Sequence, residues 1–260
     1  MRLEGSMRIS VLGCNGSITS NRRTTCYQVD DDILIDAGTG AGDLSLQQAI
    51  GINTIFLTHA HLDHCCMLPM LADAAGSFRD TPLAVYALPE TIGILMANMF
   101  NNQIWPNYTI LPAREHPYLR FIPIELGTTV ELNGRRFTPM PTRHAVPCIG
   151  YQVDNGTSSW VYSGDTTFCK EFWDALNRIE NLRYLLVETT FLDSNVSGAK
   201  SSGHMTAQLL ADGLCLLQHP AELFIVHMEA GREDDTMREI MNTVTRYEPL
   251  PLQRGQVFEL

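Results

Sequence analysis

The sequence predicts an α/β protein with partly antiparallel sheets, and two observations lead to this prediction. Short apolar runs alternate with segments of helical periodicity along the 260 residues, an order typical of strands joined by helices. The apolar runs at 24–29 and 32–36 are separated only by Asp30 and Asp31, a spacing that indicates an antiparallel hairpin. We therefore expect mixed sheets that are covered by helices.

The order of elements follows from where each apolar run starts and stops. A strand is expected at 7–13, which breaks at Gly13, and a Gly-, Ser- and Asn-rich loop follows at 14–23. After the hairpin, the stretch ILIDAGTG at 33–40 predicts a strand that ends in an aspartate and a glycine turn. The elements expected beyond it are, in order, helix 44–49, strand 54–58, helix 67–75, strand 84–87, helix 91–100, strand 185–188, helix 205–218, strand 224–227 and helix 234–246.

Three segments do not fit this alternation. Residues 101–123 carry Trp105, Tyr108 and several prolines, and we expect an elaborated loop whose aromatic side chains form a small core, a subunit contact or a stacking surface for a base. The small polar residues of 194–203 indicate a mobile segment. Residues 1–6 precede the first strand and are expected to be a disordered, dispensable leader, either an expression scar or an alternative start. Because no segment has linker character, residues 1–260 are expected to form one domain.

The composition excludes several classes of protein. Its 18 Lys and Arg residues against 29 Asp and Glu residues give a net charge of −11, which does not suggest a general nucleic-acid binder. No apolar run reaches membrane-spanning length, and the N-terminus lacks the plan of a signal peptide. The seven cysteines are odd in number and lack paired spacing, so we expect reduced thiols in a cytoplasmic protein. The adjacent Cys65 and Cys66 are interpreted as part of a helix start packed into the core.

The strongest functional signal is the run of ligand-type side chains in THAHLDH at 58–64, directly after an apolar strand. In an extended loop, alternation sends His59 and His61 to one side, where two imidazoles can hold one cation. Asp63 and His64 lie at the start of the next helix and can hold a second cation. Imidazole nitrogen and carboxylate oxygen are ligands of zinc and related divalent ions. A polar helix cap with incidental histidines is the alternative, and four such residues within six positions argue against it.

Three more ligand-type residues follow expected buried strands, namely His144, Asp165 and His227. Loops at strand ends converge to build the sites of α/β proteins. Each of these residues alone would more often be a capping or core residue, but together with the 58–64 run they predict one site. His116 and His219 are then left as surface or loop residues.

The order HxHxDH, His, Ser-Gly-Asp and His resembles the metallo-β-lactamase superfamily, and the likeness covers nearly the whole chain, from residue 7 to residue 227. The resemblance implies a four-layer αββα sandwich of two mixed sheets, with two metals at the edge where the sheets meet. In the implied ligand set, His59, His61 and His144 hold the first metal, Asp63, His64 and His227 hold the second, and Asp165 bridges the two. Zinc is the default metal, and Mn²⁺ or Fe²⁺ also suits these ligands. A diiron oxidoreductase of this fold usually has glutamate two residues before Asp63, where this chain has His61, and the difference favours hydrolysis.

Two divalent ions a few ångströms apart can share a hydroxide and lower its pKa toward neutrality, which allows in-line attack on a phosphoryl group without a covalent enzyme intermediate. The same hydroxide also opens thioesters, lactones and β-lactams, so the ligands alone do not name the substrate. A thioester or lactone hydrolase and a non-catalytic metal-binding carrier of the same fold are open alternatives.

Two further residues are candidates for proton transfer. His204, in GHMT at 203–206, is not needed for the ligand set and can donate a proton to the leaving oxygen. Glu188, in VETTF at 187–191, can orient His204 through the other ring nitrogen. A simple helix-start residue is the alternative interpretation of His204. Together with Asp63, these two residues make up the candidate catalytic set.

The segments SGDT, VETTF, SGHMT and VHMEAG resemble the phosphodiesterase branch of the superfamily, in which two members compete. Class II cyclic-nucleotide phosphodiesterases have a similar HxHLDH, which Leu62 matches, and a Gly-His-hydrophobic-Thr segment. The tRNA 3′-processing endonuclease RNase Z shares the strand-end glutamate and the later histidines, but it usually extends a basic arm to hold tRNA. Segment 101–123 offers only Arg114 and Arg120 as positive charges, and a long phosphate backbone needs many basic contacts. We therefore favour a small cyclic nucleotide, with tRNA as the alternative.

Other contacts are less well defined by the sequence. Arg22 and Arg23, in the loop before Thr24, either offer bidentate contacts to phosphate or belong to a solvated loop. The expected partner is a small phosphodiester, and no membrane partner is expected. Relatives of this fold are often dimers, which makes a homodimer an open alternative.

Overall fold

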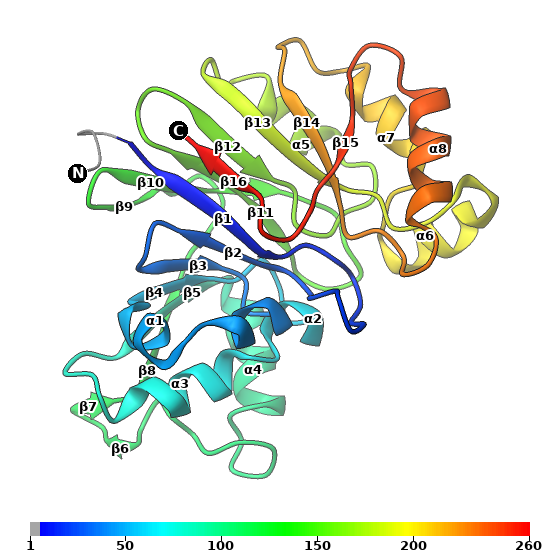
Figure 1. The fold of residues 1–260 in the computed structure, drawn as a ribbon. Coiled ribbons are helices and arrows are strands. Elements are labelled where there is room, and N and C mark those ends of the chain that lie inside the picture. The colour runs from blue at the N-terminus through cyan, green and yellow to red at the C-terminus, as the bar shows by residue number, and fades with distance from the viewer. Residues whose placement is uncertain (1–5) are drawn as a thin grey trace.

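Two large sheets pack face to face in the computed structural model, which describes residues 6–260 (Figure 1). The expected leader at 1–6 therefore lies almost entirely outside the described residues. The first sheet contains, in spatial order, β16 (Val257–Glu259), β1 (Arg8–Gly13), β2 (Cys26–Val29), β3 (Ile33–Ile35), β4 (Thr54–Phe56), β5 (Leu83–Ala87) and β8 (Leu119–Pro123). The second contains β15 (Leu250–Pro251), β14 (Glu222–Val226), β13 (Leu182–Glu188), β12 (Ser159–Tyr162), β11 (Ile149–Asp154), β10 (Arg135–Pro141) and β9 (Val130–Leu132).

Both sheets are mixed, which confirms the expectation of partly antiparallel sheets. In the first sheet, β16 to β3 pair antiparallel, and β3 to β8 pair parallel. In the second sheet, β9 to β12 pair antiparallel, and β12 to β15 pair parallel. Parallel strands end at the same edge of a sheet, so each sheet presents a row of carboxyl-terminal strand ends.

The core between the sheets is largely aromatic. Phe56 of β4 stacks on Phe137 of β10 with ring centroids 4.3 Å apart, and Tyr27 of β2 meets Trp160 of β12 edge-on at 5.2 Å. All four side chains are buried. Because full burial of a side chain such as Phe contributes about 1.5–3 kcal/mol, these rings hold the two sheets together.

Helices complete the four layers and confirm the αββα sandwich. The helices packed on the first sheet are α1 (Leu46–Gly51), α3 (Leu68–Gly76) and α4 (Pro89–Asn98). Those packed on the second are α5 (Lys170–Leu176), α7 (Ala207–Leu214) and α8 (Glu233–Thr243). Shorter pieces are α2 (Leu62–Cys65), α6 (Val196–Ser202) and the 3₁₀ turns η1 (Thr39–Asp43) and η2 (Asp193–Asn195). Local chemistry explains some of the helix starts, since Ser45 and Gln48 form a capping box at α1 and Thr206 accepts from the Leu209 amide at α7.

Segment 101–123 is only in part the expected loop. Residues Pro112–Ala113 (β6) and His116–Pro117 (β7) form a small hairpin, and β8 joins the first sheet beside β5. Tyr108 is buried and its hydroxyl donates to Asp73 of α3, while Trp105 packs against the same core. Tyr108 and Trp105 therefore pack onto the core between the first sheet and its helices.

Other regions also differ from the expectation. The segment expected to be mobile, 194–203, forms η2 and α6, in which the Asn195 side chain accepts from the Gly198 amide and Gly203 ends the helix at a φ of 76°. The sequence reasoning missed α5 and the strands β9, β11, β15 and β16, and it gave no bounds for the strand expected before His144, which is β10. In β10, Pro139 and Pro141 obscure the strand because proline is uncommon inside sheets.

The sequence predicted reduced cysteines, with Cys65 and Cys66 in a helix start packed into the core. All seven cysteines are free, and Cys65 is buried in the core beneath α3, which confirms its interpretation as part of a packed helix start. Cys66 is partly exposed.

Within residues 6–260, none of the helices combines the length and the apolar character needed to cross a membrane.

Candidate metal centre

Strand ends from both sheets meet at one edge of the sandwich. The loop after β4 and the start of α2 bring four ligand-type side chains from the first sheet, and the ends of β10, β12 and β14 bring three from the second. The seven residues form two groups, namely His59, His61, His144 and Asp165, and Asp63, His64, Asp165 and His227. Within each group, one ligand atom per residue lies within 4.8 Å of the others. All seven residues that the sequence singled out as ligands are therefore brought together.

The first group consists of three imidazoles and one carboxylate. His144 Nε2 lies 3.1 Å from His61 Nδ1. Asp165 Oδ2 lies 3.7 Å from His59 Nε2 and 3.9 Å from His144 Nε2. Burial lowers the pKa of each of these three histidines, so their imidazoles are neutral near pH 7, the form that binds metal ions.

The second group contains two imidazoles and two carboxylates. His227 Nε2 lies 3.0 Å from Asp63 Oδ2 and 3.4 Å from Asp165 Oδ2, and His64 Nε2 lies 3.4 Å from Asp165 Oδ1. Burial lowers the pKa of His64, but the carboxylates of Asp165 and Asp36 outweigh burial and hold that pKa well above its ordinary value. The field that favours a proton on this imidazole also favours a divalent cation in the same group.

The residues of both groups fit a pair of cations. His59 Nε2 and both carboxylate oxygens of Asp165 are buried and have no hydrogen-bond partner. Burying an unpartnered carboxylate is costly, and buried polar groups nearly always have a partner. Imidazole nitrogens around a shared carboxylate are a donor set suited to zinc and similar divalent ions.

Asp36 forms a hydrogen bond to the ligand-type residue His64 through the ring nitrogen Nδ1. This role was not predicted from the sequence. Asp36 lies directly after β3 with a φ of 58°, and its Oδ2 accepts from His64 Nδ1 at 2.7 Å. The amide and hydroxyl of Thr58 also donate to it, at 2.8 and 2.9 Å. Carboxylates of this kind fix the tautomer and orientation of a ligand histidine. The available signal was the aspartate before the glycine turn in ILIDAGTG, which we interpreted only as the end of a strand.

Glu188, which is buried, and the partly buried His204 form a hydrogen-bonded pair beside both groups. His204 Nδ1 donates to Glu188 Oε1 at 2.7 Å, and the Thr166 amide donates to the same oxygen at 3.0 Å. Burial would lower the pKa of His204, but the Glu188 carboxylate raises it to about 9. The His204 ring lies edge-on to His144 at 4.9 Å and stacks on His227 at 5.4 Å.

The loop at 14–23 passes directly over His227, a contact that the sequence did not predict. The His227 amide donates to the Cys14 carbonyl at 2.9 Å. A Cβ atom on Gly16 would lie 2.6 Å from His227 Cε1, so only glycine permits this close approach. In the same loop, Arg22 pairs with Glu233 and Arg23 with Asp43, so protein carboxylates already hold both guanidinium groups.

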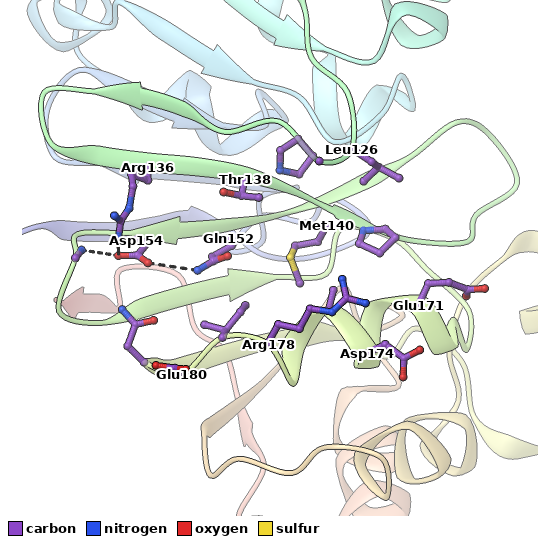
Figure 2. Close-up of a pocket in the computed structure, with 17 residues that line it drawn as sticks. Leu126, Arg136, Thr138, Met140, Gln152, Asp154, Glu171, Asp174, Arg178 and Glu180 are labelled. Atoms are coloured by element: carbon purple, nitrogen blue, oxygen red, sulfur yellow. Dashed lines mark hydrogen bonds and ion pairs between the residues drawn. The ribbon is translucent and has the colours of Figure 1, made fainter.

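A separate open pocket of about 740 Å³ lies between α5 and the strands β10 and β11 (Figure 2). None of the seven candidate ligands lines it. Among its polar side chains, Arg136 pairs with Asp154 at 2.9 Å and Gln152 donates to the same carboxylate at 3.4 Å. We do not count this pocket as part of the candidate centre.

The chain matches the family described as "Beta-lactamase superfamily domain" over residues 31–228, and it therefore belongs to this superfamily. This match confirms the resemblance that the HxHxDH, Ser-Gly-Asp and histidine motifs indicated.

Known proteins of two kinds are similar to the chain. The ribonuclease Z of Metallosphaera sedula is 30% identical over 156 residues, which cover 57% of this chain and 48% of that protein. A probable 3′,5′-cyclic-nucleotide phosphodiesterase of Yersinia pestis is 27% identical over 187 residues, which cover 64% of this chain and 51% of that protein. The matched region thus spans about half the length of these curated relatives. The structure of unliganded yeast PDE1 has the same fold, with a TM-score of 0.80 at 17% identity over 96% of this chain and 98% of that one.

Proposed function

We propose that the protein is a metal-dependent phosphodiesterase that hydrolyses a small nucleotide phosphodiester, with a 3′,5′-cyclic nucleotide as the favoured substrate. The position of His204 carries this proposal. Its ring contacts His144 of one ligand group and His227 of the other, so a proton donor stands beside both candidate cation positions. Cleavage of a phosphodiester requires charge stabilisation at the phosphoryl oxygens and a proton for the leaving oxygen, and this arrangement provides for both.

The two ligand groups would hold two divalent ions, with Asp165 shared between them. Ions in these positions supply Lewis acidity and lower the pKa of bound water toward neutrality. Zinc suits the donor set, and Mn²⁺ or Fe²⁺ also suits histidine and aspartate ligands.

His204 is the proposed proton donor. Because the Glu188 carboxylate raises its pKa to about 9 against the effect of burial, the imidazole carries its proton at neutral pH. Glu188 holds Nδ1, which leaves Nε2 to deliver a proton to the leaving oxygen. The His204 side chain is 12% exposed, so a substrate can reach it. Glu188 acts in this proposal as a positioning residue.

Asp63 is the third proposed participant. Its side chain is 24% exposed, and its Oδ2 lies 3.0 Å from His227 Nε2. A partly exposed carboxylate at this place can accept a proton from an attacking water molecule.

Charge and the packing of 101–123 favour a small substrate. This segment ends in β8 and its aromatic side chains pack under α3, so within residues 6–260 it does not project as a basic arm. It contributes only Arg114 and Arg120, and the whole chain has a net charge of −11. Binding of a long phosphate backbone depends on many Lys and Arg contacts, whereas one phosphodiester needs only the metals and a few donors.

Processing of tRNA 3′ ends is the second candidate function. The observation that favours it is the 30% identity to a protein named ribonuclease Z. The same ligand groups and the same Glu188–His204 pair would serve this reaction, so the two candidates differ in how the substrate is held.

A substrate panel separates these functions. The full chain is loaded with Zn²⁺ or Mn²⁺, its metal content is measured, and hydrolysis is followed for 3′,5′-cyclic AMP, a precursor tRNA, an aryl phosphodiester, and sets of thioesters and lactones. We expect about two metals per chain and a higher kcat/KM for the cyclic nucleotide than for the tRNA. Rapid tRNA trimming beside slow cleavage of cyclic AMP would assign the chain to tRNA processing. Preferred cleavage of thioesters or lactones, or metal binding without any turnover, would contradict the phosphodiesterase proposal.

A further inference from the structure

The Thr190 hydroxyl lies at the point where the second ligand group meets the Glu188–His204 pair. Thr190 follows β13 and is buried. Its Oγ1 lies 3.0 Å from His227 Nδ1, 3.0 Å from Glu188 Oε2 and 2.9 Å from the His227 carbonyl oxygen. The same atom lies 3.3 Å from His204 Nδ1, whose shorter contact is with Glu188. One hydroxyl therefore contacts a candidate metal ligand and both members of the catalytic pair.

The arrangement of His227 assigns a direction to these hydrogen bonds. Its Nε2 faces the carboxylates of Asp63 and Asp165, where a cation would take the lone pair of that nitrogen. The ring proton must then be on Nδ1, which makes Nδ1 a donor and the Thr190 hydroxyl its acceptor. The hydroxyl has one proton of its own, which it gives to Glu188 Oε2 or to the His227 carbonyl.

A second series of hydrogen bonds of the same kind occurs in the first ligand group. His59 Nδ1 lies 3.0 Å from Thr58 Oγ1, and that hydroxyl donates to the buried carboxylate of Asp36 at 2.9 Å. In both places a threonine that follows a strand connects a ligand histidine to a buried carboxylate. The same series of histidine, threonine and carboxylate occurs on both sheets. This repetition indicates that Thr190 orients a ligand histidine and does not only fill space in the core.

We propose that Thr190 is a positioning residue that holds His227 in its metal-binding tautomer and couples this ligand to the Glu188–His204 pair. This inference rests on the proposed function for the identity of the reaction, but its first half concerns metal binding alone. Loss of the hydroxyl should weaken one of two metal-binding steps, because ligand histidines without their outer hydrogen bond lose affinity. It should also loosen Glu188, whose Oε2 accepts from the Thr190 amide and is one of the two acceptors available to the Thr190 hydroxyl.

Thr189 provides a matched control. It is the neighbouring residue, it is also buried, and its hydroxyl donates to the Glu188 main-chain carbonyl at 2.8 Å. Thr189→Val therefore makes the same chemical change one position away. Thr190→Ser provides the rescue, since it keeps the hydroxyl and removes only a methyl group.

The first experiment measures Zn²⁺ affinity by competition with a chromophoric chelator in the wild-type chain, Thr190→Val, Thr190→Ser and Thr189→Val. We expect Thr190→Val to raise the Kd of one of the two zinc ions about 10- to 100-fold, while the other variants stay near the wild-type value. An unchanged Kd in Thr190→Val, or an equal loss in Thr189→Val, would overturn the proposal. A zinc-binding wild type that hydrolyses no phosphodiester would refute the proposed function and leave this result standing.

The second experiment tests the coupling to His204. At saturating zinc, Thr190→Val is expected to lower kcat on the order of 10-fold, because Glu188 loses one of its donors. In the His204→Ala background the same substitution should leave the residual kcat unchanged, since residues that act through one another give non-additive effects. A full further loss in that background would show that Thr190 does not act through the pair, and would overturn this half of the proposal.

Discussion

The two ligand groups share Asp165, yet they differ in how they would attract a cation. The first relies on neutral imidazoles, because burial lowers the pKa of all three of its histidines. The second adds the carboxylate of Asp63, and Asp36 stands directly behind His64. The second group therefore carries more negative charge in a buried setting. We infer that the arrangement of neutral imidazole ligands governs the affinity for a cation in the first group. In the second group, the negative charge of the carboxylates governs it.

The outer contacts of the two groups differ as well. In the first, His59 contacts the hydroxyl of Thr58 and His144 Nδ1 donates to the Gly203 carbonyl at 3.0 Å. In the second, the loop at 14–23 also packs against His227. The second group thus depends on more distant parts of the chain, and substitutions outside the ligand set should affect it more than the first group.

Removal of the shared carboxylate should have the largest effect, because it acts on both groups. Asp165→Ala is expected to lower kcat/KM about 10⁴-fold or more and to release at least one of the two metals, since each ion loses a ligand and the charge that bridges them. Metal content by elemental analysis and turnover of an aryl phosphodiester test this expectation. Retention of both metals would show that Asp165 is not a shared ligand.

Removal of His204 should lower the turnover rate, and this effect should not distinguish between the two ligand groups. His204→Ala is expected to keep both metals and to lower kcat about 100- to 1,000-fold, because the leaving oxygen loses its proton donor. His219→Ala is the control, because this imidazole lies 3.1 Å from the Asn177 carbonyl and belongs to neither ligand group. Wild-type kcat in His204→Ala would remove this histidine from the mechanism.

Substitution of Asp36 should weaken cation binding more in the second ligand group than in the first. Asp36→Asn removes the charge behind His64, and we expect the affinity for the second-group ion to fall about 10- to 100-fold with a smaller change at the first group. A two-step zinc titration with a competing chelator measures both constants. An equal loss in both steps would contradict a charge-based difference between the groups.

The smallest expected effect comes from Gly16. In Gly16→Ala the new Cβ would lie 2.6 Å from His227 Cε1, so the ring or the loop must move. Overpacking of this kind costs about 1–3 kcal/mol of folding free energy, and we expect the second-group ion to bind several-fold more weakly. Gly93→Ala in α4 is the matched control, because a Cβ there meets nothing within 4 Å. A denaturation midpoint and zinc affinity equal to wild type in Gly16→Ala would show that the loop yields without disturbing His227.

Much of this arrangement could be predicted from the sequence because the chemistry is concentrated at strand ends. The run at 58–64 supplies four ligand-type residues within six positions, and His144, Asp165 and His227 each follow a strand. Strands that run in the same direction carry such residues to a common edge within each sheet. The resemblance to a known superfamily then divided them into two groups.

The outer contacts could not be predicted, because they join residues that are distant in the chain. Asp36 is 28 positions from His64, and Thr190 is 37 positions from His227. Nothing in the local pattern around a threonine or a glycine says which side chain will approach it. The bounds of β10, the strand before His144, were not predicted for a different reason, since Pro139 and Pro141 violate the propensity rules that identify strands.

The ligands at the candidate centre come from both halves of the sandwich, with residues 59–64 on the first sheet and His144, Asp165 and His227 on the second. An ion bound there is bonded to both halves, so its binding free energy adds to the stability of the folded chain. Cellular metal supply would then govern how much of this protein survives proteolysis as well as how fast it works. Cells starved of metal would contain less of the chain, even with its synthesis unchanged.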